Sequence, residues 1–173
     1  MRRWPICLAF FALCFAACAA CAQSADPTAT AACNFDDDNQ LAVNYDPITV
    51  GVKKKVLGSE IHYDKVWSPG GKPMTLFTNT PLTIDGKEVP AGAYTLFVIP
   101  REKNWTLIIS KSTDMSGNYD ESKDLMRVPL EFGQLPQAEP NFSVYFAHTA
   151  PKECNMRMDL QKARAWTVFQ QTK

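Results

Sequence analysis

The sequence predicts an all-β fold: a single antiparallel β-sandwich domain, Ig-like or jelly-roll-like, that follows an N-terminal signal peptide. Three observations predict it. Short apolar runs recur about every 8–12 residues, with Gly, Pro and Asp between them. An Asp-Gly pair separates two of these runs, and no segment keeps a helical period over three turns. A hydrophobic content of 46% and a charged content of 21% are typical of a folded domain.

Residues 1–22 have the layout of a secretory signal peptide. A positively charged start precedes the apolar run Trp4–Ala17, which is too short to span a bilayer as a permanent helix. Ordinary cleavage before Gln23 and lipidation at Cys18 or Cys21 both stay open, because small-residue and lipobox-like patterns overlap there. We therefore expect a periplasmic, secreted or lipid-anchored protein of the bacterial envelope, attached to the membrane only through such a lipid.

A flexible arm is expected at residues 23–40, which are rich in Ala, Thr, Asp and Asn and have no apolar period. The folded domain then covers residues 41–173. Outside the leader and its edge, the chain has only two cysteines, Cys33 and Cys154. In an oxidising compartment they favour one disulfide that ties the arm to the end of the domain, with two separate thiols as the alternative. No zinc-like spacing includes them.

The first predicted strands follow from alternation and turn residues. Ile48, Val50 and Val52 alternate with polar residues or glycine, which is the period of a half-buried strand. Asp85-Gly86 lies between two short apolar runs and predicts a tight hairpin, because both central positions of that turn need a positive φ. The strands expected in this half of the chain are residues 48–52, 74–78, 82–84, 87–89, 93–99 and 105–110.

The remaining elements are predicted from polarity and proline. Residues 93–99 are mostly apolar on both faces, so we expect a central strand that forms a second hairpin with 105–110. A polar loop is expected over 111–123, and Pro129 indicates an edge or a bulge in the next strand. A Pro-rich connector is expected over 134–140. The closing strands are residues 125–132, 142–146, 156–160 and 166–169.

One stretch carries a family resemblance: Ile84–Pro100, which reads IDGKEVPAGAYTLFVIP, with Lys65-Val66-Trp67 before it. Trp105–Ile108 and Asp124–Val128 follow at the expected distance. Over residues 45–170 the chain resembles DUF2911, a family of exported bacterial domains of unknown function. The chain departs from the family pattern after the tryptophan, where an expected Arg and Thr-Gly-Ala-Asn run is replaced by Ser-Pro-Gly-Gly-Lys. The resemblance implies no reaction, and the departures imply an altered polar site.

Composition and motifs favour a non-catalytic binding domain. Without the leader, 16 basic and 18 acidic residues leave a net charge of −2, so nucleic acid is not an expected partner. No nucleophile motif, Gly-rich phosphate loop or cofactor motif is present, so no cofactor is predicted. We expect a small molecule, a glycan or an envelope protein as partner. The candidate ligand-binding residues are Lys65, Trp67, Tyr94, Arg127 and His62.

A hydrolytic or metal-dependent enzyme is the alternative hypothesis. His62 and Asp64 would share one face of an extended segment, and His148 is the only other histidine. A metal site would require the fold to bring His148 or a further carboxylate to them, so no metal ligands are assigned. Arg127 could hold an anion, or it could simply pair with the nearby Asp124.

Overall fold

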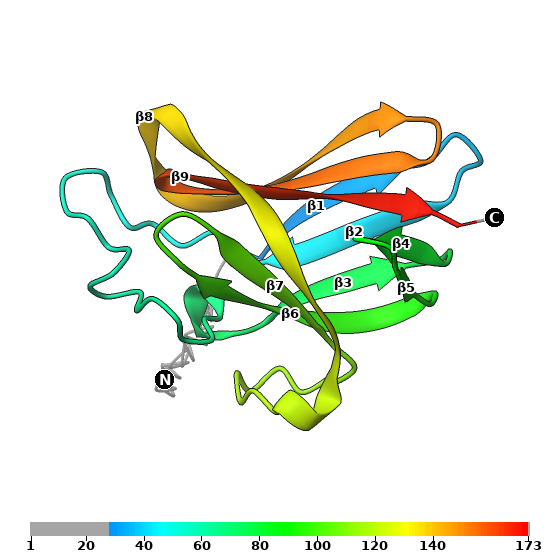
Figure 1. The fold of residues 1–173 in the computed structure, drawn as a ribbon, viewed down its shortest axis with the longest axis horizontal. Coiled ribbons are helices and arrows are strands. Elements are labelled where there is room, and N and C mark those ends of the chain that lie inside the picture. Colours follow the sequence, from blue (N-terminus) through cyan, green and yellow to red (C-terminus); the bar gives the residue numbers. More distant parts are fainter. Residues whose placement is uncertain (1–27, 173) are drawn as a thin grey trace, which may run out of the picture.

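The computed structural model describes residues 28–172 and contains nine strands and two short 3-10 helices (Figure 1). The predicted leader, with Cys18 and Cys21, lies outside the described residues. No helix within residues 28–172 is long and apolar enough to cross a membrane. The elements in chain order are β1 (Ala29–Asn34), β2 (Gln40–Tyr45), η1 (Pro69–Gly71), β3 (Met74–Thr78), β4 (Leu82–Ile84), β5 (Lys87–Val89), β6 (Gly92–Pro100), β7 (Trp105–Ser110), η2 (Glu121–Lys123), β8 (Asp124–Ala150) and β9 (Glu153–Gln171).

All nine strands join one antiparallel sheet in the order β1-β2-β3-β6-β7-β8-β9-β4-β5. β8 has 27 residues and serves two neighbours, because its first part pairs with β7 and its later part pairs with β9. The ribbon shows β8 running from the side of β7 to the side of β9 (Figure 1). The prediction of an all-β antiparallel domain is confirmed, in the form of one sheet that curls over a shared core.

Both predicted hairpins are confirmed. β4 and β5 pair from Leu82↔Val89 to Ile84↔Lys87, and the two turn residues Asp85 and Gly86 have φ of 50° and 70°. β6 and β7 pair from Thr95↔Ser110 to Pro100↔Trp105. Asp85 and Gly86 therefore both have the positive φ that a tight two-residue hairpin turn needs.

Three local predictions were wrong. The expected flexible arm is ordered from Ala29 onward, because β1 pairs with β2 through six residue pairs. Residues 48–52 do not form a strand and make only a single bridge, Thr49↔Asn141. The backbone N–H groups of Val50 and Gly51 both donate to one carbonyl, that of Pro140, so the regular alternation of strand hydrogen bonds ends there. The expected connector at 134–140 belongs to β8 instead, where register shifts accommodate its prolines.

The core is one apolar cluster enclosed by the curled sheet. Its largest fully buried members include Trp105, Phe142 and Phe169. At one end, a disulfide joins Cys33 in β1 to Cys154 in β9, with a Cα–Cα distance of 6.2 Å, so the predicted cysteine pairing is confirmed. The bond connects the edge strand to the longest hairpin of the sheet.

Candidate functional site

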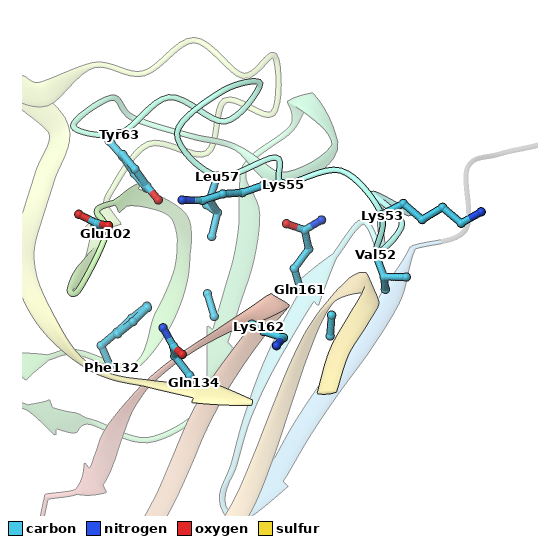
Figure 2. Close-up of a pocket in the computed structure, with 12 residues that line it drawn as sticks. Val52, Lys53, Lys55, Leu57, Tyr63, Glu102, Phe132, Gln134, Gln161 and Lys162 are labelled. Atoms are coloured by element: carbon cyan, nitrogen blue, oxygen red, sulfur yellow. The ribbon is translucent and has the colours of Figure 1, made fainter. Parts of the chain in front are cut away.

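A cavity of about 390 Å³ lies between the loop that connects β2 to β3 and the paired strands β8 and β9. Part of the β2–β3 loop, residues 52–63, forms one side, and the β6–β7 turn contributes Glu102. Figure 2 shows the side chains that surround it. The lining residues are Val52, Lys53, Lys55, Leu57, Tyr63, Glu102, Phe132, Gln134, Ala138, Gln161, Lys162 and Ala163.

One buried amide, that of Gln161, attaches the β2–β3 loop to β9. Its Nε2 donates to the carbonyl oxygens of Gly51 at 3.0 Å and Lys54 at 2.6 Å, and its Oε1 accepts from the N–H of Val56 at 3.2 Å. The side chain reaches the loop because Gln161 adopts a left-handed backbone conformation, with φ of 52°, at a register shift of the β8–β9 pairing. Gln161 therefore determines where the loop residues lie over the cavity.

The loop is further shaped by a close contact between a glycine and an aromatic ring. Gly58 has φ of 84°, and a Cβ atom at this position would lie 2.7 Å from Cε2 of Tyr63. Only glycine fits both the conformation and the contact. The following segment is attached to β6, because Trp67 and Val98 exchange backbone hydrogen bonds of 2.7 and 3.1 Å. The loop is thus held at β9 and at β6, with Tyr63 placed between the two attachments.

Positive charge predominates around the cavity. Lys53, Lys55 and Lys162 line it together with a single acidic residue, Glu102, and none of these four groups forms an ion pair within residues 28–172. Figure 2 shows Lys55 extending across the cavity toward Tyr63, whereas Lys53 extends away from the other side chains. Lys55 therefore has its ammonium group placed to meet a ligand, and Lys162 is a second lysine of the lining.

The rest of the lining is apolar or carries amide and hydroxyl groups. Leu57 and Ala163 are buried, and the ring of Phe132 is half-buried with its centroid 6.4 Å from that of Trp105. Gln134 and Tyr63 add hydrogen-bonding groups. Among the described residues that line this cavity there is no serine, threonine, cysteine or histidine.

The aromatic residues predicted to bind a ligand are packed into the domain. Trp67 makes edge contacts with Trp105 and Phe142, at ring-centroid distances of 6.4 and 5.3 Å. Tyr94 is only 8% exposed, and its hydroxyl donates to the carbonyl of Pro90 at 2.9 Å. Burial raises the pKa of the Tyr94 phenol. Neither residue lines the cavity.

Arg127 is engaged in a network that fixes the loop before β8. Its guanidinium donates to Asp124 at 2.8 Å and to the hydroxyl of Tyr119 at 2.6 Å, and it pairs with Glu121 at 2.9 Å. The Tyr119 ring makes an edge contact with Phe97 of β6. Burial and the hydrogen bond to Asp124 raise the pKa of Tyr119 to about 12. The sequence left open whether Arg127 binds an anion or pairs with Asp124, and the structure shows the pairing.

The polar candidates in the β2–β3 loop and at the β8–β9 turn are not brought together. Lys65 and His62 are exposed, and Asp64 pairs with Arg101. His148 lies 3.4 Å from Asp36 on the β1–β2 turn. Within residues 28–172, no three His, Cys, Asp or Glu side chains form a group able to hold a metal. The metal-dependent hydrolase hypothesis, which needed His62, Asp64 and His148 in one place, has no support in this geometry.

Sequence reasoning missed the residues that form the cavity. Gln161 and Lys162 interrupt the alternation of β9, and Lys53 to Lys55 form a run of three lysines in a chain that is acidic without its leader. The lysine run was the available signal. Its relation to Gln161 is not visible in the sequence, because more than one hundred residues separate the two segments.

Comparison with known protein families finds a match over most of the chain. The family model DUF2911, described as a protein of unknown function, matches residues 26–167, which include every residue that lines the cavity. The chain belongs to the DUF2911 family. Neither the curated proteins nor the solved structures include a significant match to this DUF2911 protein.

Replacing Gln161 by Ala in this DUF2911 protein is expected to release the loop over the cavity. Loss of the three hydrogen bonds should lower the free energy of unfolding by about 1–3 kcal/mol, because backbone groups of the loop lose buried partners. Local opening should also make native-state trypsin cleavage after Lys53, Lys54 and Lys55 faster. Gln134→Ala is the matched control, because Gln134 lines the same cavity without a hydrogen bond to the loop. Equal cleavage rates in the two variants would contradict the anchoring role.

Proposed function

We propose that this DUF2911 protein is an exported, non-catalytic binding protein of the bacterial envelope that holds a small organic anion in the cavity beside Gln161. The curled sheet serves as a sandwich-type scaffold, and the β2–β3 loop supplies the selective side of the site. The observation that carries the proposal is a cavity whose lysine ammonium groups form no ion pair within residues 28–172 and lie beside an apolar surface.

The dimensions of the cavity favour a small molecule among the partner classes that the sequence left open. A volume of about 390 Å³ lies within the range of pockets that enclose small ligands. Leu57, Phe132 and Ala163 offer contact for an apolar group, and the ring of Phe132 is held against Trp105.

The charge distribution favours an anionic group on that molecule. An ammonium group binds a carboxylate or phosphate through charge-assisted hydrogen bonds. Lys55 and Lys162 have no acidic partner within residues 28–172, and Glu102 is the single carboxylate of the lining. An organic anion would gain hydrogen bonds at its charged end and apolar contact at the other.

Export is supported by two independent features. The leader pattern of residues 1–22 is that of a secretory signal, and Cys33 and Cys154 are placed to form a disulfide, a bond that persists in oxidising compartments. Cell fractionation with intact-mass analysis tests this part. Recovery of the protein solely from the cytoplasm, with residues 1–22 attached, would contradict it.

Benzoate and benzamide provide a direct test of anion binding, because the two molecules share a shape and differ in charge. Isothermal titration should detect benzoate binding that weakens as salt increases, and weaker or no binding of benzamide. Lys55→Gln combined with Lys162→Gln should weaken benzoate binding by about tenfold, through loss of both charge-assisted contacts.

The control is the double variant Lys111→Gln with Lys123→Gln, which removes the same charge outside the cavity lining. It should bind benzoate as the unaltered protein does. Equal affinity for benzoate and benzamide, or an unchanged affinity in the Lys55 and Lys162 variant, would overturn the proposal.

A further inference from the structure

A second cavity, of about 510 Å³, lies between the β4–β5 hairpin and the strands β8 and β9. Its residues come from the β4–β5 hairpin, from the part of β8 next to Pro129, and from the C-terminal end of β9. The hairpin is attached to β9 by the pairs Leu82↔Gln171 and Thr83↔Gln170. Three segments that are distant in the sequence thus meet around one hollow.

An indole ring forms part of this second cavity. Trp166 is half-buried and lies directly opposite Glu131 in the β8–β9 pairing. A Cβ atom on the neighbouring Gly133 would lie 3.2 Å from Cζ3 of Trp166, so the absence of a side chain at 133 lets the ring rest against the β8 backbone. The ring is therefore supported from one side and contributes to the cavity lining.

The charge of the second cavity is opposite to that of the first. Asp85 and Glu131 are its only charged lining residues, and neither forms an ion pair within the part of the chain that the structure describes. Lys87, at the far side of the hairpin turn, donates from its ammonium to the carbonyl of Arg127 at 3.0 Å rather than to either carboxylate. Among the described residues, no lysine or arginine lines the cavity.

We infer that this second cavity binds an organic cation, a small molecule that carries an ammonium group on an apolar body. An indole face attracts a cation through its quadrupole, and the attraction strengthens when the site is shielded from water. The carboxylates of Asp85 and Glu131, which form no ion pair within residues 28–172, add Coulomb attraction. Thr83, Thr167 and Gln170 offer oxygen acceptors for ammonium N–H groups. Leu130 gives the apolar body a surface to contact.

Benzylammonium and its neutral analogue benzyl alcohol test the inference. Titration followed by tryptophan fluorescence and calorimetry should show binding of benzylammonium and weaker or no binding of the alcohol. Asp85→Asn combined with Glu131→Gln should weaken benzylammonium binding by about tenfold, and Trp166→Leu should weaken it by a similar factor. Glu88→Gln is the matched control, because this exposed carboxylate of β5 does not line the cavity.

A second measurement covers the case in which a variant does not fold. In the unaltered protein, the indole N–H resonance assigned to Trp166 should shift on addition of benzylammonium and stay in place on addition of benzoate. Equal binding of the cation and the alcohol, an unshifted Trp166 resonance, or unaltered affinity in a folded Asp85 and Glu131 variant would overturn the inference. Benzoate binding at the lysine-lined cavity can fail or succeed independently of these results.

Discussion

Replacing both Cys33 and Cys154 by Ala is expected to lower the free energy of unfolding by about 4–5 kcal/mol. The disulfide joins residues separated by 121 positions, so it removes a large part of the freedom of the unfolded chain. Equilibrium unfolding in guanidinium chloride, with and without a reducing agent, measures the effect.

The reducing agent supplies the internal control for this first prediction. It should destabilise the unaltered protein to about the level of the double variant, and it should leave the double variant unchanged. A loss below about 1 kcal/mol on removal of the bond would mean that the unfolded chain gains little freedom from its absence.

Replacing Phe142 by Ala should lower the free energy of unfolding by about 3–5 kcal/mol. Phe142 is fully buried, and its ring makes edge contacts with Tyr45 and Trp67 at centroid distances of 5.8 and 5.3 Å. Truncation would leave a cavity where β8, the end of β2 and the β2–β3 loop meet. Chemical denaturation of the purified domain gives the value directly.

Phe77→Ala provides the matched comparison for Phe142, because it removes the same atoms from a residue of β3 that is 44% exposed. This control should change the free energy of unfolding by less than about 1 kcal/mol. If both variants lost similar amounts of free energy of unfolding, burial of the ring in the curled sheet would not explain the destabilisation.

Local signals made much of the fold predictable. Asp85-Gly86 indicates its hairpin because the turn depends on two adjacent residues, and the apolar run of β6 indicates a central strand because both of its faces are covered. Phe97 illustrates the second face, since it lies under Tyr119 from the loop after β7. Such features can be predicted because they depend only on adjacent residues or on the apolar character of a single strand.

Features that depend on distant partners could not be predicted. Ala29–Asn34 has the composition of an arm, yet β2 supplies a pairing edge that orders it as β1. Residues 48–52 alternate like a strand, yet the part of β8 beside them is distorted by prolines and offers a single bridge. The cavity likewise depends on distant partners, because Gln161 contacts residues 51–56 through hydrogen bonds that span more than one hundred residues of sequence.

The position of the disulfide also determines how the domain would respond to mechanical tension. A pulling force applied between the two chain ends travels from residue 33 directly to residue 154 through the sulfur atoms, so the segment between them bears no load. The disulfide therefore shortens the fully extended length of the chain by about 400 Å. The strands from β2 to β8 lie between the two cysteines and carry none of this force along their backbone. While the disulfide is intact, the force can extend only the parts of β1 and β9 that lie outside it.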